Sequence, residues 1–168
     1  MRKKEAYSIY QAGDIVVHPS HGGCVVREIC DREFRGETRR YYVLVPKSEP
    51  HTTILDPVES VQQIGLHDVM TPEQADQILT FVSTAQLHWI TDNSKRRNAY
   101  TETIKFGSLT DMAMMIKELL VHGRQAPLNQ HDKTMLRCAQ KKLLSEIALA
   151  KEIDFDSALE LMNRATAS

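Results

Sequence analysis

The chain has 168 residues, of which 42% are hydrophobic and 26% are charged, and its formal net charge at pH 7 is −1. This length holds one ordinary domain or two small ones, and the composition is typical of a folded rather than a disordered chain. The near-zero charge argues against a protein that coats nucleic acid by bulk charge, but it is compatible with a local basic surface.

The sequence indicates a cytoplasmic protein that does not cross a membrane. Its apolar runs fall well short of the roughly 20 residues that a membrane-spanning helix needs. The basic start, MRKKEAYSIY, lacks the apolar core of a signal peptide. The three cysteines, Cys24, Cys30 and Cys138, form no regular framework, as expected for reduced thiols.

The first third of the chain has the pattern of short β-strands. DIVVH (14–18) and GCVVREI (23–29) are rich in β-branched residues and flank the turn PSHGG. An aromatic and aliphatic run at 41–45 and a stretch at 51–61 supply further strands. Such short strands with tight turns, in about 60 residues, predict a small antiparallel β-barrel of the SH3-like or Tudor-like type.

From residue 70 onward the pattern changes to that of helices. Thr71, Ser108 and Asp154 each stand where a helix N-cap is expected. We expect helices over 72–83, 92–105, 107–123, 130–151 and 154–165. The predicted fold is therefore α+β, with a β-barrel domain at 1–66 followed by an all-α domain of about five helices at 67–168.

The H-x2-H-x2-C spacing of His18, His21 and Cys24 raises the question of a metal or catalytic centre. A zinc site would need a fourth donor, such as Cys30 or His51, and strand alternation works against all four donors pointing inward. A cysteine nucleophile paired with His21 would lack a third group to orient it. No glycine-rich phosphate loop or hydrolase motif occurs in the chain. We therefore interpret these residues as a hairpin turn and expect no enzyme activity, metal or cofactor.

Two basic stretches lie in the predicted helical domain. Lys95, Arg96 and Arg97 are consecutive, and Asn98 follows them. A second set, four residues apart and so on one face of the long helix, comprises Lys133, Arg137 and Lys141. Either stretch alone is ordinarily a solvated helix face. Together they predict a phosphate-contacting surface with loose, salt-sensitive binding.

The single tryptophan, Trp89, has two interpretations. It is either a core anchor that joins the first two helices or an apolar wedge that inserts at a base step of DNA. By sequence position alone, the core anchor is favoured.

The stretch AGDIVVHPSHGGCVVREI, with the later GE and YYVLV, resembles the opening of the CarD/CdnL family of bacterial transcription regulators. In the second half, KRRNAYTETIKFGS is similar to the basic segment of that family. LNQHDKTMLRCAQKKLLSEIALAK is similar to its long-helix motif, which is the most specific part of the resemblance. The resemblance runs in order along nearly the whole chain.

The resemblance implies that the N-terminal domain is Tudor-like, is shared with the transcription-repair coupling factor and binds the β subunit of RNA polymerase. The helical domain is then expected to contact promoter DNA at the upstream edge of the melted region and to stabilise the open complex. Arg32 matches a polymerase-contacting arginine of the family, whereas Ile54 or Leu55 stands at the position where family members often have another arginine. The expected DNA contacts are Trp89, Lys95, Arg96, Arg97, Asn98, Lys133, Arg137 and Lys141.

The chain departs from the family at the tryptophan wedge. Asn93 stands at the aligned position, and Trp89 lies one helical turn earlier. Either Trp89 takes that role or the protein grips phosphates only, and our hypothesis is that Trp89 approaches DNA.

Two other classes of function are alternatives to a regulator that binds both polymerase and DNA. The first is a polymerase-binding protein that occludes other factors without touching DNA. The second is a free-standing DNA-binding protein, which the net charge disfavours. We expect a monomer, with a strand-swapped dimer as the alternative, associated with the nucleoid through polymerase.

Overall fold

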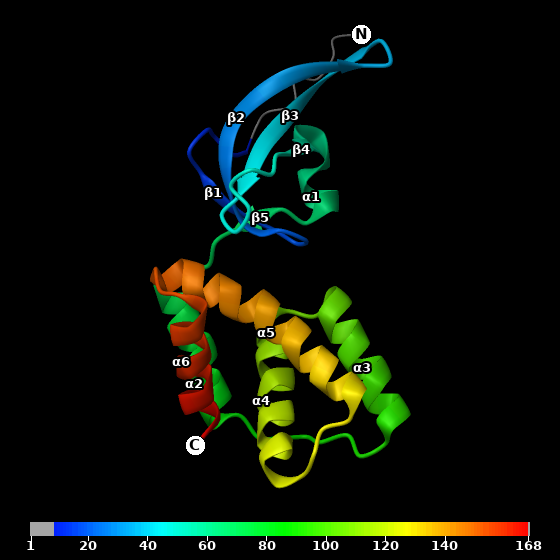
Figure 1. The fold of residues 1–168 in the computed structure, drawn as a ribbon, viewed down its shortest axis with the longest axis vertical. Coiled ribbons are helices and arrows are strands. Elements are labelled where there is room, and N and C mark those ends of the chain that lie inside the picture. The colour runs from blue at the N-terminus through cyan, green and yellow to red at the C-terminus, as the bar shows by residue number, and fades with distance from the viewer. Residues whose placement is uncertain (1–8, 168) are drawn as a thin grey trace. The chain divides into compact units, whose positions relative to one another are not determined.

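The computed structural model describes residues 9–167. The chain divides into two compact units, Met1–Val69 and Met70–Ser168 (Figure 1). The first contains the strands β1 (Ile15–His18), β2 (Gly22–Phe34), β3 (Glu37–Pro46), β4 (Ile54–Pro57) and β5 (His67–Asp68), with a 3-10 turn at Val58–Ser60 and the short helix α1 (Val61–Ile64). The second is helical. The expected α+β organisation is therefore confirmed.

The five strands form one antiparallel sheet in the order β4-β3-β2-β1-β5. The expected closure into a barrel is not seen, because β4 and β5 stay at opposite edges of the sheet. These edge strands have only four and two residues, so each offers little backbone for further pairing, and Pro57 at the end of β4 has no N–H to donate.

The hairpin of β2 and β3 is the longest part of the sheet and extends away from the other strands (Figure 1). Its two-residue turn consists of Arg35 and Gly36, with φ of 53° and 79°, which fits the twist of the flanking strands. The pairing skips one residue between Val26 and Glu28, so Arg27 is the extra residue of a β-bulge.

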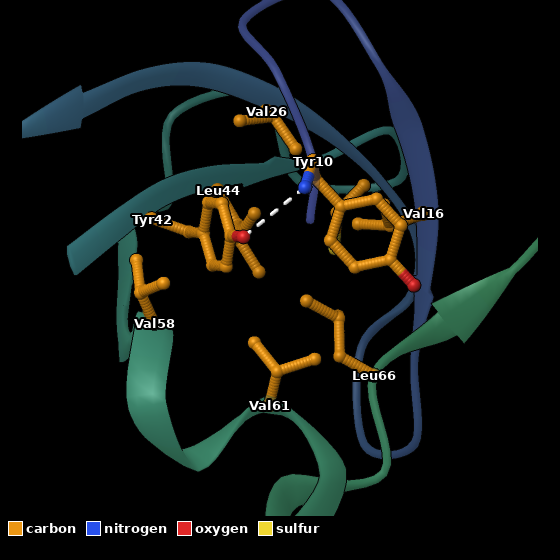
Figure 2. Close-up of a cluster of buried hydrophobic side chains, with 9 residues drawn as sticks. Tyr10, Val16, Val26, Tyr42, Leu44, Val58, Val61 and Leu66 are labelled. Atoms are coloured by element: carbon orange, nitrogen blue, oxygen red, sulfur yellow. Dashed lines mark hydrogen bonds between the residues drawn. The ribbon is translucent and has the colours of Figure 1, made fainter. Parts of the chain in front are cut away.

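The core of the first unit lies on one face of this sheet (Figure 2). The Tyr42 hydroxyl accepts hydrogen bonds from the backbone N–H groups of Ile9 (2.9 Å) and Tyr10 (3.1 Å). The Tyr10 ring packs edge-on against Tyr42. The N-terminal segment is thereby attached to the sheet. The other buried members of this core are Val16, Cys24, Val26, Leu44, Val58, Val61 and Leu66.

The PSHGG segment forms the β1–β2 turn, as predicted. The His18 Nδ1 accepts hydrogen bonds from the backbone N–H groups of Ser20 (3.0 Å) and His21 (3.2 Å). His21 is exposed, but His18 is buried, with its Nε2 3.5 Å from a buried Asp56 carboxylate. Within residues 9–167, no three His, Cys, Asp or Glu side chains are grouped so as to hold a metal ion.

The second unit consists of α2 (Pro72–Thr84), α3 (Asn93–Phe106), α4 (Leu109–Gln125), α5 (Gln130–Lys151) and α6 (Phe155–Thr166). The side chains of Thr71, Ser108 and Asp154 each accept a hydrogen bond from a backbone N–H of the first helical turn, which confirms the predicted starts of α2, α4 and α6. The helix predicted to end at Gly123 continues to Gln125. No helix in the described part of the chain is long and apolar enough to span a membrane.

Helix α5 is the centre of this unit, because it packs against α2, α3, α4 and α6 (Figure 1). Its residues Leu143, Leu144 and Ile147 are fully buried. The opposite face of α5 is left for polar and charged side chains.

Candidate binding surfaces

The outer half of the β2–β3 hairpin carries Arg32. All residues from 31 to 40 are exposed, and Arg32 pairs across the strands with Arg39. Two like charges directly opposite one another destabilise a hairpin. Arg39 is compensated by carboxylates of Glu37 (3.0 Å) and Glu59 (3.5 Å). The hairpin therefore tolerates a concentration of positive charge on one face.

The register places the two predicted polymerase-contact positions on the same face of the sheet. Antiparallel partners share a face, and Arg39, Tyr41 and Val43 alternate along β3. Arg32 pairs with Arg39, and Leu55 pairs with Val43. Both therefore lie on the face opposite the Tyr42 and Leu44 core. Of the two alternatives in β4, Leu55 is 44% exposed, whereas Ile54 packs against the core.

Phe34 belongs to the same surface and was missed in the sequence analysis. It is two residues after Arg32 on the same strand and is 65% exposed. The strand alternation of β2 was the signal that pointed to it. We call Arg32, Phe34, Arg39 and Leu55 the hairpin face.

In the helical unit, the structure separates the consecutive cations at the start of α3. Lys95, Arg97 and Asn98 are exposed, but Arg96 is only 3% exposed. Because one helical turn holds 3.6 residues, three consecutive side chains cannot all face outward when one side of the helix is packed. Arg96 is the one that points inward.

The Arg96 guanidinium is fully engaged inside the unit. Its Nε and Nη2 donate to the two carboxylate oxygens of Asp132, at 3.1 and 2.7 Å. It also donates to the Ile90 carbonyl (2.7 Å), the Thr91 carbonyl (3.5 Å) and the Asn93 side-chain oxygen (2.7 Å). These donors join α3 to α5, so Arg96 is less available for the phosphate contact expected of it than its exposed neighbours, and that contact stays a prediction.

Trp89 takes part in the same network. Its indole stacks on the His122 ring, with ring centroids 3.7 Å apart and planes 12° from parallel. The Arg96 guanidinium lies 4.4 Å from the indole centroid, at cation–π distance. Trp89 is half-buried and joins the segment before α3 to α4. The structure thus places it as the core anchor rather than as a wedge held out to solvent.

The second basic set, by contrast, lies on a solvent-facing side of α5. Lys133, Arg137 and Lys141 are all exposed, on a side distinct from the buried Leu143 and Ile147. Helices α3 and α5 pack together, and the Lys142 ammonium donates to the Ile104 carbonyl at 3.0 Å. The structure therefore brings the two basic helices into contact, with six of the predicted DNA-contacting side chains exposed.

The fold and these surfaces define a class: a two-unit interaction protein with an open-edged β unit and a helical unit that exposes cations. Residues 10–70 match the family model of the CarD-like/TRCF RID domain, and residues 77–163 match that of the CarD C-terminal domain. The chain belongs to the CarD family, whose domains are those of transcription regulators rather than enzymes.

A relative is similar to this chain along most of its length, as the two family models are together. The Bacillus subtilis (strain 168) protein named "Putative transcription factor YdeB" is 26% identical over 145 residues. The aligned region covers 86% of this chain and 94% of that protein. The similarity thus includes both units.

Proposed function

We propose that this protein binds the β subunit of RNA polymerase through its N-terminal unit and contacts promoter DNA through its helical unit, thereby stabilising the open complex. The observation that carries the proposal is the match of each compact unit to its own CarD-family domain, in order. The exposed hairpin face and the exposed cations of α3 and α5 supply surfaces suited to the two partners.

Docking on polymerase has two components in this proposal. The outer edge of β4 offers backbone groups to an added strand, a common mode of peptide recognition. Arg32 supplies a cation for an acidic group of the partner, and Leu55 supplies an apolar contact. Because β4 has only four residues, backbone pairing along this edge aligns the partner, and the side chains of the hairpin face provide most of the affinity and specificity.

The DNA contacts need not be strong once the protein is docked. Docking raises the effective concentration of the helical unit near DNA, so a few cations suffice in a chain of net charge −1. The side chains available for these contacts on α3 are the exposed Lys95, Arg97 and Asn98. If these contacts form only with melted promoter DNA, they shift the equilibrium toward the open state by their differential free energy.

The test is the lifetime of open complexes at a ribosomal RNA promoter, measured after adding a competitor that traps free polymerase. We expect the protein to lengthen this lifetime and both Arg32→Glu and the double variant Lys95→Ala/Arg97→Ala to lose the effect. Arg40→Glu, on the other face of the hairpin, and Arg164→Ala, on α6, are the matched controls. An unchanged lifetime despite polymerase binding would contradict the proposal.

A second candidate function is occlusion of other factors on polymerase without DNA contact. It is supported by the burial of Arg96 and the packing of Trp89, because both side chains make contacts inside the helical unit. Crosslinking between the helical unit and promoter DNA distinguishes the two candidates. Polymerase binding with no such crosslink would select occlusion.

A further inference from the structure

Phe106, the last residue of α3, is the most exposed large hydrophobic side chain in the described part of the protein, at 84%. It is also isolated. In α3, α4 and α5, all of which the structure describes, no other large hydrophobic side chain is exposed. Single exposed hydrophobic side chains are common on protein surfaces, so a role for Phe106 depends on the groups around it.

The corner that carries Phe106 is tightly built. The chain turns between α3 and α4 at Gly107, where a Cβ atom would lie 2.6 Å from the Thr103 carbonyl oxygen. The Gly107 N–H donates to that same carbonyl at 2.9 Å. Ser108 then caps α4 through a reciprocal pair of bonds with Asp111. Phe106 is therefore held on a rigid corner between two capped helices.

Two lysines lie at this end of α3. Lys105 is the neighbouring residue and is exposed. Lys142 of α5 donates to the Ile104 carbonyl at 3.0 Å, two residues before Phe106. The nearest carboxylate along α3 is that of Glu102, one turn earlier. An exposed aromatic ring with cations at the same end of its helix suits a nucleotide, which presents a flat base beside a phosphate.

We propose that Phe106 stacks on an unpaired base of a nucleic acid strand while Lys105 and Lys142 contact the adjacent phosphates. The inference rests on the proposed function, because it specifies what the DNA-contacting unit binds. A protein partner fits less well, since protein docking uses a contiguous apolar patch and Phe106 stands alone. Trp89 is not a competitor for this role, because it is packed against His122 and Arg96.

The test uses the full-length protein and a single-stranded oligonucleotide containing 2-aminopurine, with a duplex of the same sequence as the reference. Stacking on the fluorescent base quenches its emission. We expect Phe106→Ser to weaken binding to the single strand roughly tenfold, the loss of one stacked base. Binding to the duplex and the melting temperature should stay unchanged. Phe106→Trp should restore quenching, and Phe155→Ser, on α6, is the matched control.

Each other outcome has a distinct meaning. Equal single-strand binding by the wild type and Phe106→Ser would overturn the inference but leave the proposed function intact. An equal loss on single strand and duplex would also overturn it, since base stacking would not explain a loss on paired DNA. If Phe106→Ser lost polymerase binding instead, the ring would belong to a protein interface. If the wild type bound neither DNA, the inference would be overturned, whereas the proposed function, in which docking on polymerase supplies the effective concentration, would still be decided by the open-complex lifetime.

Discussion

The outer half of the β2–β3 hairpin and the first turns of α3 are both rich in arginine, but they use it in opposite ways. Every side chain of the hairpin from 31 to 40 is exposed, because no other element within residues 9–167 covers this part of the sheet. In α3, packing against α5 draws Arg96 inward and leaves Lys95 and Arg97 outside. A basic run in a sequence therefore counts as surface charge only after the packed side of its element is known.

The largest expected effect tests the structural role of Arg96. Arg96→Ala should lower the free energy of unfolding by about 3–5 kcal/mol, because it leaves the buried Asp132 carboxylate without its partner. Chemical denaturation measures this loss. Arg97→Ala, at the exposed neighbouring position, should stay within about 0.5 kcal/mol of the wild type. Similar losses of unfolding free energy for the two variants would mean that Arg96 contributes no more to stability than the exposed Arg97.

The next effect concerns Trp89. Trp89→Ala should lower the free energy of unfolding by about 2 kcal/mol, less than the ~3–5 kcal/mol of a fully buried tryptophan, because the indole is half-buried. It should also expose His122 and Arg96. Equilibrium unfolding followed by circular dichroism is the measurement. A variant with wild-type stability but shorter-lived promoter complexes would instead support the wedge.

A pH-dependent effect is expected in the first unit. Burial raises the pKa of Asp56, so this carboxyl favours folding when protonated and opposes it increasingly as pH rises above about 4, its unfolded pKa. Asp56→Asn should therefore increase stability at pH 7, by an amount that shrinks toward pH 4. Burial lowers the pKa of His18, so its contribution runs the other way and is lost as pH falls below about 6.5.

Thermal melts of the wild type and Asp56→Asn across pH 4–8 check this prediction. Because His18 lies 3.5 Å from the Asp56 carboxylate, the two groups are coupled, and the same comparison in a His18→Gln background isolates the Asp56 contribution. A difference that grows as pH falls would mean that the carboxylate is stabilised in the folded state.

The smallest expected effect lies on the hairpin face. Arg32→Glu should raise stability slightly, since it replaces two opposed arginines by a cross-strand ion pair with Arg39. The same change should abolish polymerase binding if the proposed function holds. A melting temperature slightly above the wild type, together with lost binding in a direct assay, would show that this surface is kept for recognition at a cost in stability.

Local signals predicted the helical unit well. Thr71, Ser108 and Asp154 marked helix starts because an N-cap bond involves residues only three apart in the chain. The prediction of a closed barrel was not confirmed. Closure depends on pairing between strands that are far apart in the sequence, and the local pattern of a short edge strand does not indicate its partner. The sequence held one signal for the burial of Arg96, which is the aromatic residue Tyr100 four positions later on the same side of the helix. The structure shows both side chains buried.

The bulge at Arg27 determines where the hairpin points. Before it, the even-numbered residues Cys24 and Val26 face the core, and after it the odd-numbered Ile29 takes that side, so β2 consists of two segments in opposite phase. Replacing the exposed Arg27 side chain should change the direction of the hairpin little, because the extra residue remains in the strand. Deleting the residue would leave every other pair matched but would straighten the strand, since bulges bend and twist the strand that carries them. The hairpin face would keep its side chains, but Arg32 and Phe34 would point in a different direction.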